Sequence, residues 1–333
     1  MAATREIRLA LPSKGPLAEP ARQLLDQAGL YVHHPNPRQY QASIPNLPGV
    51  TVLFQRPGDV VVSVRDGSVD FGITGWDVFT EKRGENGSIL PIHPALGFGQ
   101  CTLNVIVPEA WEKVNSFTDL KALQAEWNRP LKVATKFPVQ AEAFFRQNGL
   151  KDVKFISAEG TLEIAPTIGY ADLITDLVST GVTLRDNRLK CLVDGQILAS
   201  QACLIANRIS LKNNQVTLGV ARILLEFIVA CLRARDNVSV FANMRGDSPE
   251  SIARQMFTKA VIGGLQGPTL SPVITRQGEK WYAARLVVRK DQLTRAISEL
   301  RSVGGSGVVV SPVSYIFEEE PAEYQAMLRQ LEG

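Results

Sequence analysis

The segment from Asp172 to Asn187 constrains the fold and chemistry of this chain more than any other. It begins as an apolar strand that carries Asp172 and Asp176, and at the two-residue period of a strand both carboxylates leave the same face. The strand runs into Ser179-Thr180-Gly181 and then Thr183, and the glycine lets the backbone turn. The hydroxyls and backbone amides of residues 179–183 can converge on one anion.

A strand that ends in acids and a small, donor-rich loop is suited to a sugar phosphate. The carboxylates would face ribose hydroxyls or magnesium, while the loop holds the phosphate. The alternative interpretation is a buried strand followed by an ordinary Ser/Thr/Gly turn. Two acids inside an apolar strand favour the ligand site, because burying unpaired carboxylates is costly.

The composition is that of an ordinary globular protein, with 45% hydrophobic and 21% charged residues. A length of 333 residues suggests two or three domains. The net charge of +3 is too small to indicate nucleic-acid binding but is compatible with small anionic substrates. No stretch approaches the apolar length of a membrane span, and the first residues lack a signal-peptide core. We therefore expect a cytoplasmic protein without nucleic-acid or membrane partners.

The cysteines and histidines do not favour metal or triad chemistry. The four cysteines show no metal-ligand spacing and lie in apolar surroundings, which indicates buried thiols in a reducing compartment. They are Cys101, Cys191, Cys203 and Cys231. Three histidines are too few to favour a histidine-based zinc site.

Strands and helices alternate along the first half of the chain. Residues 7–12 predict a strand, residues 13–15 a turn, and the apolar positions from Leu17 to Ala28 a helix that ends at Gly29. Residues 35–49 contain four prolines and predict an irregular loop. Further strands are expected at 50–54, 69–75, 95–107, 132–135, 154–157 and 172–178, with helices before 65, at 76–81 and at 139–148. This α/β pattern predicts largely parallel sheets, with ligands at the carboxyl ends of the strands.

The last hundred residues have a different order of elements. After a helix at 218–234, the sequence predicts a strand at 238–242 and a helix that Ser248 caps, with Pro249 in its first turn. Strands at 272–275 and 281–288, a helix at 293–303 and a strand at 307–312 complete a βαββαβ unit of the ferredoxin-like kind. One more helix is expected at 321–331.

Several motifs together resemble the ATP phosphoribosyltransferase family over nearly the whole chain. The most specific is Asp172-x-x-x-Asp-Leu-Val-Ser-Thr-Gly-x-Thr-Leu, which matches the family's phosphoribosyl-pyrophosphate loop. The supporting matches are Leu-Ala-Leu-Pro-Ser-Lys-Gly-x-Leu17, Gly67-x-x-Asp-x-Gly-Ile-Thr-Gly75, Leu96-Gly-Phe-Gly-x-Cys101, Ala134-Thr135, Glu163-x-Ala-Pro166, Ala202-Cys-Leu-Ile-Ala-Asn207 and Pro268-Thr-x-Ser-Pro272.

The resemblance implies the family's long form and its architecture. That form has two periplasmic-binding-protein-like lobes and a C-terminal ferredoxin-like domain that senses histidine, and it assembles with itself as a dimer or hexamer. On this chain the implied boundaries are residues 1–100 with 196–235 for lobe I, 101–195 for lobe II and 236–333 for the regulatory domain. The implied reaction joins ATP to phosphoribosyl pyrophosphate with magnesium present, releases pyrophosphate and opens histidine biosynthesis.

The resemblance also implies roles for individual residues. The loop residues Asp176, Ser179, Thr180, Gly181 and Thr183 would bind the 5-phosphate, and Asp172 and Glu163 would serve the ribose or the metal. On the ATP and pyrophosphate side the candidates are Lys14, Gly15, Arg56, Asp59, Gly75 and Asp77. For Asp77 a helix cap is an equal alternative. Thr269 and Ser271 are candidate contacts for histidine, although either could only shape the turn between two prolines.

Two positions depart from the family pattern. Pro16 stands where the family has arginine after the Lys-Gly turn, a loss for which Arg22 or Arg38 could compensate. Val60-Val61 stands where the family has Ile-Pro, and we expect this to alter a turn. The competing hypothesis is a non-catalytic ligand-binding or regulatory protein on the same scaffold, but an intact Asp176–Thr183 loop favours the enzyme.

Overall fold

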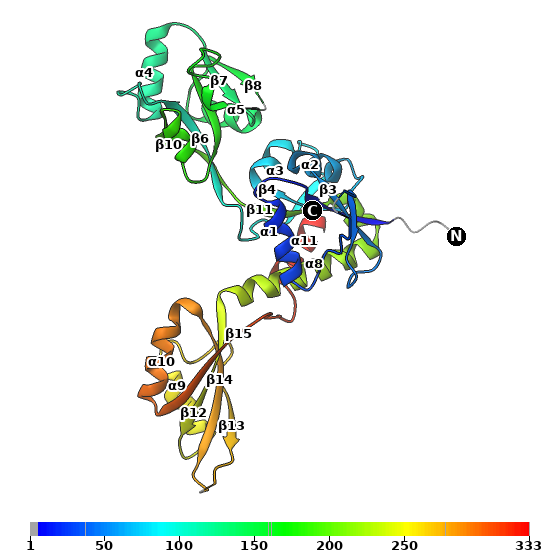
Figure 1. Ribbon diagram of the computed structural model, residues 1–333, viewed down its shortest axis with the longest axis vertical. Helices are drawn as coiled ribbons and strands as arrows, with labels where there is room; N and C mark the ends of the chain where they lie inside the picture. Colours follow the sequence, from blue (N-terminus) through cyan, green and yellow to red (C-terminus); the bar gives the residue numbers. More distant parts are fainter. Residues whose placement is uncertain (1–5, 37, 159, 161, 277, 333) are drawn as a thin grey trace, which may run out of the picture. The chain divides into compact units, whose positions relative to one another are not determined.

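The computed structural model describes residues 6–36, 38–158, 160, 162–276 and 278–332. The chain divides into two compact units, Met1–Leu225 together with Ala322–Gly333, and Glu226–Pro321. The first unit holds two sheets, one in each of two lobes, and the second unit holds one sheet (Figure 1). The α/β class, with two lobes and a C-terminal ferredoxin-like domain, is confirmed.

Lobe I is built on a six-stranded sheet in the order β2-β3-β1-β4-β11-β5. Three parallel strands form its centre: β3 (Val50–Gln55), β1 (Ile7–Pro12) and β4 (Phe71–Gly75). β11 (Ala202–Asn207) runs antiparallel to both β4 and β5 (Ile89–His93). The short β2 (Gln41–Ser43) pairs with β3 inside the expected irregular loop, because three residues among prolines give too short a pattern to detect.

Each parallel strand of lobe I leads into a helix. These helices are α1 (Ala18–Gln27), α2 (Pro57–Arg65) and α3 (Trp76–Lys82). Helix α2 approaches β4 closely because Gly72 has no side chain, and a Cβ there would lie 2.5 Å from Val60 Cγ1. Val60 and Val61 are fully buried within α2, so the turn expected at this departure from the family pattern is wrong.

Lobe II has a five-stranded sheet in the order β10-β6-β9-β7-β8. β8 (Val153–Ser157), β7 (Leu131–Thr135) and β9 (Leu173–Val178) are parallel. β6 (Cys101–Pro108) runs antiparallel to both β9 and β10 (Leu189–Ser200). The helices are α4 (Phe117–Trp127), α5 (Pro138–Gln147), the 3₁₀ turn η1 (Leu162–Ile164) and α6 (Val182–Asp186).

The chain crosses between the lobes twice, through residues 94–100 and through Gln201. The strands next to these crossings reverse direction, so the expectation of largely parallel sheets holds only for β3-β1-β4 and β9-β7-β8. β10 stays paired with β6 as far as Ser200, opposite Cys101. The second boundary of lobe II therefore falls near Gln201 rather than at residue 195.

The second unit contains the predicted βαββαβ order. Its elements are β12 (Asn237–Arg245), α9 (Pro249–Phe257), β13 (Thr269–Val273), β14 (Trp281–Arg289), the 3₁₀ turn η2 (Lys290–Gln292), α10 (Leu293–Ser302) and β15 (Gly305–Pro312). All pairs in its sheet, β13-β14-β12-β15, are antiparallel. Ser248 caps α9 through a hydrogen bond from the Ser251 amide, as expected.

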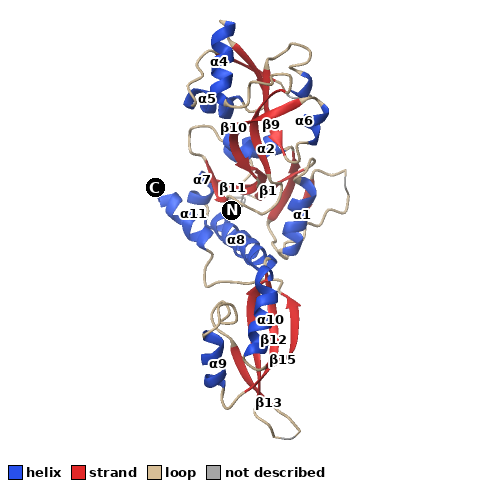
Figure 2. Cartoon of the chain, turned by 90° about the vertical axis from the view of Figure 1, so that its left-hand side faces the viewer, coloured by secondary structure: helices blue, strands red, loops and turns tan. Residues whose placement is uncertain are grey.

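The last helix, α11 (Ala322–Glu332), belongs to the first unit and not to the expected domain 236–333. It buries Tyr324, Met327 and Leu331 and contacts β5. The guanidinium of Arg222 lies over the Tyr324 ring at 5.7 Å. Helix α11 therefore packs beside α7 (Arg208–Asn213) and α8 (Gln215–Arg235) (Figure 2), because its apolar face matches the surface of lobe I.

Helix α8 is long and apolar enough, by length and composition, to cross a membrane. The expectation that no stretch reaches this length is therefore wrong. Half of its most apolar stretch is buried inside the protein, which is also the pattern of a core helix in a globular protein. One such helix is weak evidence for a membrane span.

Candidate functional site

The predicted phosphate loop follows the carboxyl end of β9. Gly181 has φ 70° and occupies the N-cap of α6, so the backbone adopts the left-handed conformation that glycine tolerates best. Ser179, Thr180 and Thr183 are exposed. The loop thus offers three accessible hydroxyls around one sharp turn, as the sequence predicts.

Asp176 lies directly before this loop and is largely withdrawn from solvent. Its Oδ1 accepts a hydrogen bond from the Leu177 amide at 2.8 Å. Burial raises the pKa of Asp176, and the nearby carboxylate of Glu163 adds to the rise, while the Leu177 amide and the ammonium of Lys136 oppose it. The structure therefore brings Asp176 and Glu163 together, beside a cation that the sequence reasoning did not single out.

Lys136 could have been found from its position. It follows Thr135 at the carboxyl end of β7, the parallel neighbour of β9. The hydroxyl of Thr175 donates to the hydroxyl of Thr135 at 2.6 Å, and the Phe137 amide donates to the same Thr135 oxygen at 2.9 Å. These buried bonds tie the ends of the two strands and fix the backbone on both sides of Lys136.

Asp172 has a different position from the one expected. It lies before the first residue of β9, at the end opposite to the loop, where Arg129 Nη1 and Nη2 each donate to its carboxylate at 2.7 Å. The Lys132 amide donates to the same carboxylate at 2.8 Å. Although burial acts in the opposite direction, these bonds lower the pKa of Asp172. The carboxylate is engaged in an ion pair between strands, so this structure does not support its expected role at the ribose or metal.

The guanidinium of Arg129 is itself held by an aromatic ring. Its central carbon lies 4.3 Å from the centroid of the Trp127 ring. Arg129 therefore links the end of α4 to the start of β9 through one stacking contact and one two-pronged ion pair. This arrangement is structural and lies apart from the loop.

The candidates for ATP or pyrophosphate lie at the carboxyl edge of the lobe I sheet. Lys14 and Gly15 follow β1, Arg56 follows β3, and the Ser13 amide donates to the Gln55 carbonyl at 2.7 Å to join these two turns. Lys14 and Arg56 are exposed, and Gly15 has φ 83°. Asp59 is exposed in the first turn of α2, where a negative charge also stabilises the helix.

Arg22 and Arg38 are the two arginines that could replace the charge missing at Pro16, and they differ in how far they are available. Arg22 directs its guanidinium over the ring of Phe54, at 5.0 Å from the centroid. Its Nε is buried without a hydrogen-bond partner among the described residues. Arg38 is exposed, so of the two arginines only Arg38 presents its charge fully to solvent.

Asp77 is buried at the start of α3, with 5% of its surface exposed. Ser200 Oγ donates to its carboxylate at 2.6 Å and accepts from its amide at 2.9 Å. The carboxylate also explains Gly75, because a Cβ there would lie 2.3 Å from Asp77 Oδ1. Asp77 thus holds the start of α3 against the second crossing between the lobes.

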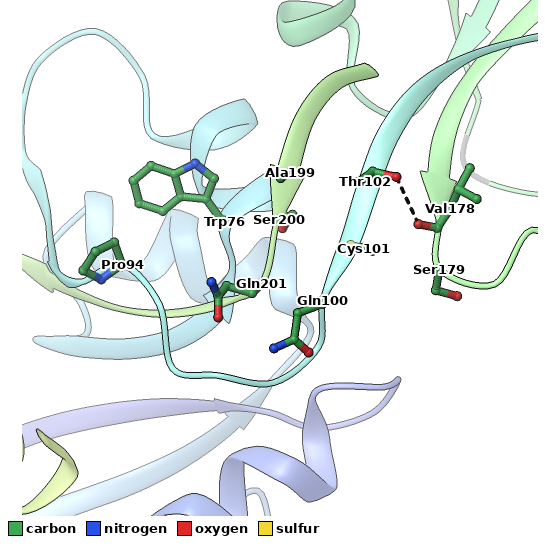
Figure 3. Close-up of a pocket in the computed structure, with 10 residues that line it drawn as sticks. All are labelled: Trp76, Pro94, Gln100, Cys101, Thr102, Val178, Ser179, Ala199, Ser200 and Gln201. Carbon is green, nitrogen blue, oxygen red and sulfur yellow. Dashed lines mark hydrogen bonds between the residues drawn. The ribbon is translucent and has the colours of Figure 1, made fainter. Parts of the chain in front are cut away.

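A cavity of about 480 Å³ lies where the two crossings meet the loop (Figure 3). It is lined by Trp76, Pro94, Gln100, Cys101, Thr102, Val178, Ser179, Ala199, Ser200 and Gln201. Burial raises the pKa of the Cys101 thiol, and the charge of Asp77 adds to the rise, so Cys101 stays a neutral thiol. Ser179 is the loop residue that reaches this cavity, opposite Trp76 from lobe I (Figure 3).

The two lobes are also joined beside this region by Glu81 of α3. Its carboxylate accepts from the amides of Val139 and Gln140 at 2.9 and 3.1 Å, at the start of α5. Gln140 Nε2 donates to the Thr80 carbonyl at 2.9 Å. Burial raises the pKa of Glu81 in spite of these bonds, and α5 begins two residues after Lys136.

In the second unit a cavity of about 530 Å³ includes Thr269 but not Ser271. Arg285 stands opposite Thr269 in the sheet and lines the same cavity. Arg233 and Glu318, which form an ion pair with each other, also line it. Ser271 lies two residues further along β13, on the same face of the strand as Thr269, and is exposed.

The expectation of buried thiols holds for two of the four cysteines, since Cys101 and Cys191 are only half-buried. All four are unpaired, and Cys203 and Cys231 are buried. Burial strongly raises the pKa of Cys203. Among the residues that the structure describes, no group of three His, Cys, Asp or Glu side chains could hold a metal ion.

Comparison with known proteins identifies the family of this chain. A family model described as ATP phosphoribosyltransferase matches residues 56–227, and a model of the HisG C-terminal domain matches residues 234–315. ATP phosphoribosyltransferase 1, chloroplastic, from Arabidopsis thaliana is 42% identical over 98% of this chain and 81% of its own length. ATP phosphoribosyltransferase from Rhodopseudomonas palustris is 32% identical over 97% of this chain and 98% of its own length.

A solved structure has the same fold. The HisG:HisZ ATP phosphoribosyl transferase complex from Thermotoga maritima includes a chain that aligns with a TM-score of 0.53 and 23% identity. The alignment covers 67% of this chain and 98% of that one. From the family models and the relatives together, the chain belongs to the ATP phosphoribosyltransferase family.

Proposed function

We propose that the two-lobed unit joins ATP to phosphoribosyl pyrophosphate at the cavity between its crossings, using the Asp176–Thr183 loop to hold the sugar phosphate. The reaction is that of the family: it forms phosphoribosyl-ATP, releases pyrophosphate and opens histidine biosynthesis. The observation that carries the proposal is the left-handed Gly181 turn, which presents exposed hydroxyls beside a cavity that lobe I completes.

The loop is suited to the 5-phosphate of the sugar. Ser179, Thr180 and Thr183 supply hydroxyl donors, and the adjacent backbone amides can add further hydrogen bonds. Because these donors are fixed by the strand end and by α6, little rearrangement is needed when phosphate binds. In this role the loop fixes the ribose relative to the attacking base.

Asp176 and Glu163 would stabilise the charge that forms on the sugar. An adenine ring nitrogen attacks the anomeric carbon as pyrophosphate departs, and positive charge builds on the ribose during this step. Two neighbouring carboxylates favour that charge. The ammonium of Lys136 and the Leu177 amide partly offset the rise that burial causes in the pKa of Asp176.

Glu163 and Asp176 are the carboxylates that would hold magnesium. Mg²⁺ is usually held by one or two carboxylates and by substrate phosphates, and these two residues suit that kind of binding. Asp172 does not, because it is engaged with Arg129. Magnesium supplies the positive charge that neutralises the departing pyrophosphate. Lys14 and Arg56 would bind the phosphates of ATP or pyrophosphate as fixed cations at the edge of lobe I.

We propose further that the second unit senses histidine. The cavity beside Thr269 offers Arg285 for the carboxylate of a free amino acid, and Glu318, which pairs with Arg233, for its ammonium group. Ser271 would contribute through the same sheet face. Histidine should inhibit without competing with phosphoribosyl pyrophosphate, and Arg285→Ala should weaken inhibition while leaving basal turnover intact.

Self-association and a cytoplasmic location complete the proposal. The plant relative is named as chloroplastic, which places that protein in a different compartment from the one expected here. Four free thiols are consistent with a reducing environment. The dimer or hexamer is tested by the mass of the purified protein with and without histidine.

The decisive experiment is a turnover assay with purified protein, ATP, phosphoribosyl pyrophosphate and magnesium. Phosphoribosyl-ATP should form, and excess chelator should stop its formation. Turnover that persists with chelator would contradict the metal requirement. Tight ligand binding with no turnover would favour the alternative, a non-catalytic binding protein on this scaffold.

A further inference from the structure

The cavity between the crossings is lined by neutral residues. Of the ten described residues that line it, none carries a charge, and the polar ones are amides, hydroxyls and one thiol. Phosphate groups require cations or several converging donors, and the candidate cations Lys14 and Arg56 do not line this cavity. Its volume of about 480 Å³ lies within the usual range of small-molecule sites. The cavity therefore suits an uncharged part of a substrate.

This cavity is lined by residues from the phosphoribosyl side and from the nucleotide side of the proposed site. Ser179 belongs to the phosphoribosyl loop, and Trp76 follows β4, one of the strands of the nucleotide side. Figure 3 shows the indole of Trp76 and the side chain of Ser179 at opposite ends of the labelled group. In the reaction a ring nitrogen of the base must reach the anomeric carbon held by the loop. The base must therefore occupy space that adjoins Ser179.

Trp76 is fixed before any ligand binds. Its amide donates to the Gln201 carbonyl at 2.8 Å, and its carbonyl accepts from Thr80 Oγ1 at 2.9 Å. The indole packs against the buried ring of Phe79, with centroids 5.0 Å apart and planes inclined by 45°. An aromatic ring held in this way loses little entropy when a flat ligand stacks on it.

Gln201 adds a directed donor to the same cavity. The Gly97 amide donates to Gln201 Oε1 at 3.0 Å, so the carboxamide oxygen is engaged at the first crossing. The amide nitrogen then remains as a donor, and the ring nitrogens of a purine are acceptors. A flat aromatic surface and one in-plane donor are the usual means of holding a nucleobase.

We propose that Trp76 is the stacking platform for the purine base of ATP and determines the affinity of the enzyme for that substrate. The proposal rests on the proposed function and names the base subsite within it. Trp76 acts by contact with the base, and Gln201 orients the base by a hydrogen bond to a ring nitrogen.

The test compares Trp76→Leu, which removes the aromatic ring but keeps an apolar side chain, with Trp76→Phe, which keeps a ring. Trp76→Leu should raise the KM for ATP about tenfold or more, while Trp76→Phe should raise it about threefold or less. The KM for phosphoribosyl pyrophosphate should change less than about twofold in both. Unchanged thermal midpoints would show that both variants are folded.

Intrinsic fluorescence gives a readout that a purely structural role would not affect. ATP alone should change the emission of the wild-type protein, and Trp76→Phe should abolish that change. Trp111→Phe is the matched control, because Trp111 packs edge-on against Trp127 in lobe II and should keep the ATP response.

The outcomes separate this inference from the proposed function. Wild-type turnover combined with an unchanged KM for ATP in Trp76→Leu would overturn the inference and leave the reaction in place. A raised KM for phosphoribosyl pyrophosphate alone would assign the cavity to the sugar and also overturn it. Absence of turnover in the wild type would reject the proposed function, and the fluorescence response to ATP would still decide whether Trp76 meets the base.

Discussion

Asp172, just before β9, and Asp176, within β9, have carboxylates in opposite environments. At the start of the strand, the carboxylate of Asp172 is paired with Arg129 and its pKa is lowered. Near its end, Asp176 lies beside another carboxylate and its pKa is raised, first of all by burial. A carboxylate with its hydrogen-bonding capacity met stabilises a fold, whereas one held at a raised pKa near a ligand loop is typical of a functional site.

The largest expected effect is that of Asp176→Asn. Removing the charge that faces the developing positive charge should lower kcat about a hundredfold or more. Stability at neutral pH should be unchanged or higher, because the ionised form of a group with a raised pKa is disfavoured in the folded state. Steady-state kinetics and urea unfolding measure the two effects.

The pH dependence of the stability of Asp176→Asn tests the direction of the Asp176 pKa shift. A raised folded-state pKa favours the folded state at a pH below the unfolded value, and this contribution is lost as the pH rises through the folded value. The stability of the wild type relative to Asp176→Asn should therefore fall between acid and neutral pH. A rise over that interval would contradict the assignment of Asp176.

The second largest effect is expected for Gly181→Val. A β-branched residue at φ 70° is strained, although the space beside the glycine is open, with Val178 Cγ1 as the nearest atom at 3.9 Å. The strain should distort the loop and weaken phosphoribosyl pyrophosphate binding about tenfold or more, at an expected cost of about 1–3 kcal/mol. Binding calorimetry with this substrate and with ATP alone separates loop damage from general misfolding.

Thr183→Ala should be milder, because it removes a single exposed hydroxyl from the first turn of α6. The loss of one charge-assisted hydrogen bond corresponds to about 1.5–3 kcal/mol of binding free energy at most. Thr183→Ser, which keeps the hydroxyl, is the control and should retain the affinity. Equal loss in both variants would mean that the methyl group, not the hydroxyl, matters at this position.

Asp172→Asn should have the smallest effect on catalysis and a clear effect on the fold. We expect kcat within about twofold of the wild type and a loss of about 1 kcal/mol in the free energy of unfolding, since Arg129 is partly exposed and solvent screens the pair. The lowered pKa means that this stability is present above the unfolded pKa and is lost as the pH falls through the folded one. A large loss of kcat with normal stability would mean that Asp172 acts in the site and not in the fold.

The sequence predicted local features well because they depend on neighbours in the chain. The Gly181 turn, the Ser248 cap and the βαββαβ order are of this kind. The partners of Asp172 could not be predicted, because Arg129 and Lys132 are about forty residues away and only strand order brings them near. Lys136 was overlooked for a related reason: its importance depends on β7 and β9 being neighbours.

Two expectations about the length of an element were wrong. Three paired residues in β2 are too few to show a period, and the apolar stretch of α8 reaches the length of a membrane span although no stretch of that length was expected. The domain boundary failed for another reason. The amphipathic pattern of residues 322–332 predicts a helix but does not state which surface it covers.

The return of α11 to the first unit affects how the chain matures during synthesis. β5 and the buried His93, whose pKa burial lowers and the charge of Glu323 raises in part, meet this helix only after residues 322–332 have been made. Residues 226–321 have their own core, so their folding does not depend on α11. A released chain that stops before Ala322 would thus contain a complete second unit and a first unit that lacks the helix covering β5.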